Sequence, residues 1–182
     1  FSCGINAQQL ESLKILKIKH DSIETQLKLK YQEEIKGKSE SEISEIYYQN
    51  LLSRSKNNRE RLDHYFSAVQ TFLETQKLIG PSQEAAQQEI PDKTANYSQG
   101  FPALYKEVHD FIKNRYQDRL DEFFTKSAKI HFIVQNDHSL YIEKVEGTEK
   151  EFNDLALLAF LMTTGKWESA FQRGTNVKSK FV

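Results

Sequence analysis

The chain has 182 residues, of which 38% are hydrophobic and 28% are charged, and its net charge is −1. This composition is typical of a folded chain, and the length allows one or two compact units. The balanced charge lacks the basic field that nucleic-acid backbones require, so we expect no nucleic-acid partner. The longest apolar run, Leu155 to Met162, has eight residues, far fewer than the roughly 20 of a membrane span.

The opening residues 1–8, FSCGINAQ, resemble the end of a secretory signal, because small residues lead to Ala7, where cleavage before Gln8 would occur. We therefore interpret them as a signal-peptide remnant and expect an exported, periplasmic chain. A second interpretation makes Cys3 a lipoprotein acylation site that attaches the chain to a membrane, and a third is an ordinary frayed terminus. Cys3 is the single cysteine, which excludes an internal disulfide.

Residues 9–79 carry the pattern of long amphipathic helices. Neither Pro nor Gly occurs between Leu10 and Ile35. Within that stretch an apolar stripe recurs at spacings of three and four, formed by Leu13, Leu16, Ile23 and Leu27 together with His20. Ser39 and Glu42 resemble a capping box that begins a second helix. We interpret His20 as a residue of a helix interface.

Two questions about this helical unit stay open in the sequence. The wholly polar stretch from Ser53 to Arg61 fits either a solvated part of one long helix or a break between two helices. The apolar stripes need a partner, which is either the other helix of an intramolecular hairpin or a second chain in a coiled coil. The second possibility would make the chain a homo-oligomer through its N-terminal helices.

Residues 80–99 contain Gly80, Pro81 and Pro91 among small polar side chains, and this composition predicts a linker. The pattern then changes. Residues 103–120 are predicted as a helix after Pro102, and residues 128–145 as two strands around a polar turn at 136–138. A further helix is predicted over 149–164 and a closing strand over 176–182. The order helix, strand, strand, helix, strand predicts an α+β domain over residues 100–182.

The stretches KIHFIVQNDHSLYIEKVEG, FNDLALLAFLMTTGKW and GKWESAFQRGTNVKSKFV, preceded by GFPALYKEVHDFIKNRY, together resemble the C-terminal domain of TonB, particularly its Bacteroidetes-type versions. In the closing stretch the family's glycine, tryptophan, small and final-strand apolar positions are occupied by Gly165, Trp167, Ala170, Gly174, Val177 and Phe181. The chain departs from the family at Gln117, Ser169 and His138, where the family has a proline, a second proline and a turn glycine. We therefore expect a helical N-terminal unit followed by a small TonB-like domain.

The resemblance implies a periplasmic domain that pairs by its sheet edge with short extended segments of partner proteins, typically outer-membrane transporters. We place this partner-binding edge on the final strand, at Asn176, Val177, Lys178, Ser179, Lys180 and Phe181. One row of this strand can face the helices while its lysines face water and favour acidic or polar partner segments. A linker of about 20 residues is too short to cross an envelope. We therefore expect an envelope adaptor, with a self-associating helical scaffold as the alternative.

No residue pattern predicts catalysis. The sequence contains neither a G-x-S-x-G element nor a glycine-rich phosphate loop. Its five histidines include no pair at a helical spacing of four; only His131 and His138 could approach each other, across the predicted turn, and no cysteine or carboxylate pair completes a metal site. We expect neither enzyme activity nor a metal, a cofactor or a small-molecule substrate, and we interpret Trp167 as a core residue rather than a binding platform.

Overall fold

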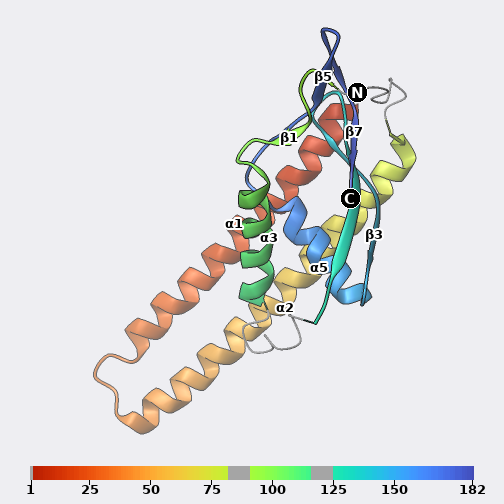
Figure 1. Cartoon of the computed structure of the whole chain (residues 1–182). Helices are drawn as coiled ribbons and strands as arrows, with labels where there is room; N and C mark the ends of the chain where they lie inside the picture. Colours follow the sequence, from red (N-terminus) through yellow and green to blue (C-terminus); the bar gives the residue numbers. More distant parts are fainter. Residues whose placement is uncertain (1, 82–90, 116–124) are drawn as a thin grey trace. The chain divides into compact units, whose positions relative to one another are not determined.

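A computed structural model describes residues 2–81, 91–115 and 125–182. It confirms an α+β fold in which an N-terminal helical part is followed by small antiparallel sheets (Figure 1). The chain divides into two compact units: a hairpin unit of residues 11–68 and a mixed unit of residues 1–10 and 69–182. This division differs from the predicted bounds 9–79 and 100–182, because the last turns of the second helix belong to the mixed unit.

The hairpin unit is built from parts of two long helices, α1 (Ser2–Glu34) and α2 (Glu40–Ile79). They are joined by a short turn in which Gly37 has a φ of 71°, a value that suits glycine. The polar stretch from Ser53 to Arg61 lies inside α2, so of the two alternatives that the sequence left open the structure shows one long helix and no break. Whether residues 1–8 are a signal remnant stays a prediction.

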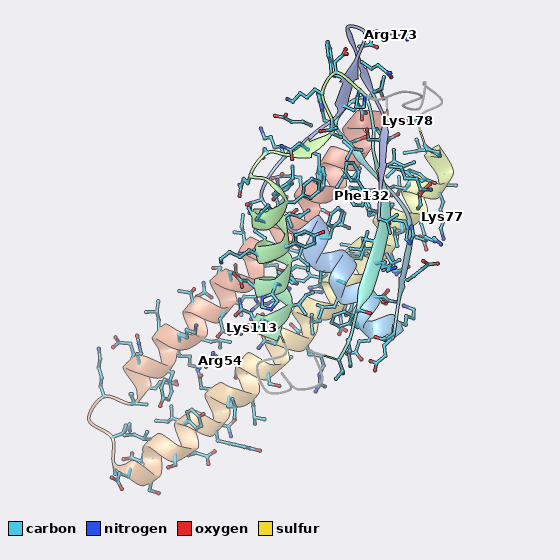
Figure 2. All side chains as sticks on the ribbon, in the orientation of Figure 1. Arg54, Lys77, Lys113, Phe132, Arg173 and Lys178 are labelled. Carbon is cyan, nitrogen blue, oxygen red and sulfur yellow. The ribbon has the colours of Figure 1, made fainter. Side chains whose placement is uncertain are left out.

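The polar stretch is part of the interface between α1 and α2. Arg54, labelled in Figure 2, donates to Glu24 at 2.7 Å. One turn of helix before Arg54, the amide of Asn50 donates to the backbone oxygen of Leu27 at 2.8 Å. Arg61 pairs with Asp21 at 3.2 Å. The two helices therefore form a hairpin within one chain, and polar contacts contribute much of its interface.

His20 lies at the centre of this interface and is only 1% exposed. Its Nδ1 lies 2.8 Å from Oδ1 of Asn57, and the Asn57 amide donates to the His20 backbone oxygen at 3.3 Å. Its Nε2 lies 3.0 Å from Nδ1 of His64. The interpretation of His20 as an interface residue is confirmed.

The predicted capping box is also confirmed at the start of α2. Glu42 accepts hydrogen bonds from the backbone N–H of Ser39 at 3.0 Å and from its hydroxyl at 2.8 Å. The backbone bond is the largest cause that lowers the pKa of Glu42 to about 2 from an ordinary 4.5; the Ser39 hydroxyl and Lys38 add to it. The carboxylate at this position also faces the positive end of the α2 dipole.

We expect this cap to make the hairpin unit sensitive to acid. Because the pKa of Glu42 is lower in the folded state, its contribution is complete above pH 4.5 and is lost as the pH falls toward about 2. In Glu42→Gln this part of the acid destabilisation should be absent. Urea unfolding of both proteins across that pH range, followed by circular dichroism, measures it. Glu45→Gln, an exposed carboxylate one turn later, is the control and should keep the wild-type pH dependence.

The mixed unit is organised around one central helix. Its principal elements are α3 (Phe101–Arg115), β2 (Ala128–Val134), β3 (Leu140–Gly147), α5 (Lys150–Leu161) and β7 (Ser179–Phe181). The strands form an antiparallel sheet in the order β3–β2–β7. Helix α5 packs against β2, β3 and α3, which explains why eight of its residues are buried, namely Phe152 and every residue from 155 to 161. The prediction that this helix is the core is confirmed.

Two small antiparallel pairs complete the mixed unit. One joins β1 (Asn96–Tyr97) to β4 (Trp167–Glu168), and the other joins β5 (Ala170–Gln172) to β6 (Thr175–Val177). Lys93 also exchanges backbone hydrogen bonds with Phe171. The C-terminal half of the predicted linker therefore pairs with the sheet region. Residues 82–90 of that linker, and residues 116–120 of the helix predicted over 103–120, lie outside the described residues.

Candidate functional site

The predicted binding strand, residues 176–182, is divided between two sheets. Thr175–Val177 pairs with β5, whereas Ser179–Phe181 pairs with β2. Between β5 and β6 lies a two-residue turn, Arg173 and Gly174, whose φ angles are 49° and 85°. Two positive φ values match the hairpin turn that fits the natural twist of strands. Arg173 lies at the tip of this hairpin (Figure 2).

The side chains of β7 alternate as the sequence predicts. Ser179 is 8% exposed, and the ring of Phe181 stacks on Phe132 at a centroid distance of 5.2 Å. On the other side, Lys180 is exposed. Its ammonium group lies 2.7 Å from the carboxylate of Glu143 on β3. Lys180 is therefore already paired within the sheet, so its attraction for an acidic partner is weaker than the sequence alone suggested.

An aromatic cluster supports β7 from the core side. Trp167 lies within 6.1 Å, between ring centroids, of Phe101, Phe132 and Phe181, and it is only 7% exposed. Phe132, labelled in Figure 2, is a residue of β2. The interpretation of Trp167 as a core residue is confirmed. The cluster fixes the inner face of β7 and leaves its backbone edge as the feature available for recognition.

Tyr97 joins β1 to the end of α5. Its hydroxyl donates to Glu107 at 2.9 Å and accepts the backbone N–H of Gly165. The second oxygen of Glu107 accepts from the backbone N–H of Thr164 at 2.7 Å. Burial raises the pKa of Tyr97 above its ordinary value of 10.0. This network holds β1 and β4, and with them Trp167, behind the edge strand.

The opposite edge of the sheet carries a contact that the sequence analysis missed. Gln76, on the last turns of α2, donates from its amide to the backbone oxygen of Leu140 at 2.5 Å. Its oxygen accepts the backbone N–H of Ile142 at 2.9 Å. The sequence did contain a signal for this contact, because Gln76 lies at helical spacing from Val69 and Phe72, on the same buried face of α2. A polar residue on such a stripe requires buried partners.

These two bonds also fix the direction of the backbone groups in the whole sheet. The backbone N–H and C=O groups of Leu140 and Ile142 point outward, toward Gln76. Those of Tyr141, between them, therefore point toward β2, where Tyr141 lies opposite Ile133. The direction of the backbone groups alternates from residue to residue along an antiparallel strand. The backbone groups of Phe132 and Val134, on either side of Ile133, therefore point toward β7, where these two residues lie opposite Phe181 and Ser179. The N–H and C=O of Lys180 therefore point to the outer edge of β7. Among the described residues, no strand pairs with that edge.

The two histidines near the predicted turn have separate partners. His131 lies 2.9 Å from Glu146. His138 adopts a φ of 67°, and its Nδ1 accepts the backbone N–H of Ser169 at 3.0 Å. Two of the three positions at which the chain departs from the TonB pattern thus contact each other, and a proline at 169 could not donate this bond. The third, Gln117, lies outside the described residues. No group of three or more His, Cys, Asp or Glu that could hold a metal is found in the described parts of the chain.

What this arrangement offers chemically is backbone pairing along β7. None of the helices in the described ranges combines the length and apolar character that a membrane span requires. Comparisons of the chain with models of protein families, with curated proteins and with solved structures return no match.

Proposed function

We propose that the mixed unit is a protein-binding module of the cell envelope that captures an extended partner segment by strand addition at β7. The observation that carries the proposal is the register of the β3–β2–β7 sheet, which turns the N–H and C=O of Lys180 outward at an edge. An edge strand with a free donor and acceptor can take up a strand of another protein. Backbone pairing of this kind tolerates the departures from the TonB pattern at His138 and Ser169.

The resemblance to the TonB C-terminal domain suggests the location and the partner. We propose a periplasmic adaptor that binds a segment of an outer-membrane transporter, with no enzymatic step, cofactor or small-molecule substrate. The side chain of Lys180 is paired with Glu143, so we expect the partner to be selected mainly by its ability to adopt an extended backbone rather than by its charge. In this proposal the module links transporters to other envelope components.

The proposal is tested by two proline variants of neighbouring residues. Lys180→Pro removes an outward N–H and should keep the fold, because edge strands accept proline there. It should weaken partner binding by about tenfold, because one backbone hydrogen bond to the partner is lost. Ser179→Pro removes an N–H that faces β2 and should unfold the mixed unit. Lys180→Ala keeps the N–H and should bind as the wild type does.

A photo-crosslinking residue at Lys178, followed by mass spectrometry of envelope extracts from the source cells, identifies what is bound. Crosslinks to one extended segment of another protein that are lost in Lys180→Pro support strand addition. Equal crosslinking in a folded Lys180→Pro protein contradicts it.

A second candidate function is a self-associating scaffold, favoured by one observation in the hairpin unit. Ile18 and Leu29 are 69% and 57% exposed. They lie on one face of α1, because eleven residues make about three turns of helix. Apolar side chains exposed on one face of a helix offer contacts to a second copy when they join into a continuous patch. Crosslinks that join copies of this same chain would support the scaffold instead of the adaptor.

A further inference from the structure

The side-chain N–H and the side-chain oxygen of Gln76 both form hydrogen bonds with backbone groups at the edge of β3. The side chain is 2% exposed, so it cannot exchange these bonds for water without moving. It reaches one carbonyl and one N–H that lie two residues apart, on Leu140 and Ile142. A residue of an adjacent parallel strand would bond to the same two groups. The amide of Gln76 therefore occupies the place of a neighbouring strand.

The contact closes the regular part of the β3 edge. Beyond Ile142 the register with β2 shifts, because Glu143 is an extra residue between the partners of His131 and Phe132. Such a bulge interrupts an edge and hinders the addition of another strand. The one regular stretch of β3 before the bulge is the stretch that Gln76 covers. The two edges of the sheet thus differ, since β7 turns Lys180 outward without a strand beside it among the described residues.

We propose that Gln76 is an edge cap that closes β3 to strand addition and directs extended partners to β7. The second part of this inference rests on the proposed function; the first part does not, because it concerns β3 alone. When the cap is absent, the outward groups of Leu140 and Ile142 form a template for a strand edge of a second copy. The uncapped chain should therefore dimerise through β3.

The first test replaces Gln76 by methionine, which has a similar length and no amide. In Gln76→Met we expect the hydrogen-exchange protection of the Ile142 N–H to fall about tenfold in dilute monomer. At higher concentration the protein should dimerise in analytical ultracentrifugation. Gln70→Met is the matched control, because Gln70 is an exposed glutamine on the same part of α2. It should remain like the wild type in both measurements.

The second variant, Gln76→Glu, separates the hydrogen bonds from the packing. A protonated carboxyl group has one donor and one acceptor and can replace the amide, whereas an ionised one has lost the donor. Burial raises the pKa of a carboxyl group above its ordinary value of about 4.3. We therefore expect Gln76→Glu to dimerise at about pH 8 and to return to monomer at about pH 5, while the association state of the wild type is the same at both.

A third variant shows where the copies associate. Adding Tyr141→Lys to Gln76→Met places a charge on β3, which should restore the monomer if association uses that edge. A Gln76→Met protein that stays monomeric with unchanged Ile142 exchange would overturn the proposal, as would a dimer that Tyr141→Lys leaves intact. Unfolding of both Gln76 variants would also overturn it, because the contact would then be a requirement of the fold. The proposed function is tested by other variants, Lys180→Pro and Ser179→Pro, so each of the two proposals can fail without the other.

Discussion

Replacing Gly165 by alanine is expected to lower the free energy of unfolding of the mixed unit by about 3 kcal/mol, as overpacking and lost hydrogen bonds together do. A Cβ atom at residue 165 would lie 2.2 Å from Cζ of Tyr97 and 2.5 Å from its hydroxyl oxygen. Tyr97 is fully buried, so its ring has no free space into which it can move. The substitution must displace either the ring or the backbone after α5.

The loss should exceed that of an ordinary glycine substitution because Tyr97 connects several elements. Displacing its hydroxyl weakens the bonds to Glu107 and to the backbone of Gly165. The pairing of β1 with β4 should loosen with them, since Tyr97 lies opposite Trp167. Urea unfolding followed by the fluorescence of Trp167, the single tryptophan, measures the effect in this unit.

Gly37→Ala is the matched control. No atom lies within 4 Å of a Cβ at Gly37, but its φ is 71°, so alanine there has only backbone strain, about 1 kcal/mol. Its loss should appear in the hairpin unit by circular dichroism and leave the Trp167 transition unchanged. Equal losses for the two variants would show that contact with Tyr97 has no special role. In a Tyr97→Ala background, Gly165→Ala should be far less harmful, because the clash is absent.

Features that depend on neighbours in sequence could be predicted from the sequence. The capping box needs only Ser39 and Glu42 at a spacing of three, and the apolar character of α5 follows from its composition. In each case the physical cause lies within a few residues of the signal, so one sequence is enough to see it.

Features that depend on distant partners could not be predicted. The final strand reads as continuous, yet its two halves pair with β5 and β2, and nothing near Lys178 reveals this division. The linker pattern around Pro91 hides the pairing of Tyr97 with Trp167, because two-residue strands have no periodicity to detect. Gln76 was visible only as a polar residue on an apolar stripe. Its partners on β3 are 64 and 66 residues away, which no local pattern specifies.

The second large effect on stability is expected at the polar interface of the hairpin unit. Because the Asn57 amide donates to the backbone oxygen of His20, its Oδ1 faces Nδ1 of that histidine and accepts from it. Nδ1 therefore carries the proton and Nε2 is the acceptor in neutral His20. His64 must then donate from its Nδ1 across 3.0 Å. One amide thus determines the tautomers of two histidines.

Asn57→Ala should lower the free energy of unfolding of the hairpin unit by about 3 kcal/mol, because two bonds are lost and the buried N–H of His20 has no acceptor. Hydrogen exchange should accelerate in both helices around His20 and Asn57, and the nitrogen chemical shifts of His20 should move toward a mixture of tautomers. Gln49→Ala, which removes an exposed amide bonded only to Glu45 at 2.9 Å, is the control and should change stability by less than about 0.5 kcal/mol. An Asn57→Ala protein with wild-type exchange and an unchanged His20 tautomer would show that packing alone holds the two helices together. If the tautomer changes while stability does not, the polar interface determines the pairing of the helices without adding to their free energy of association.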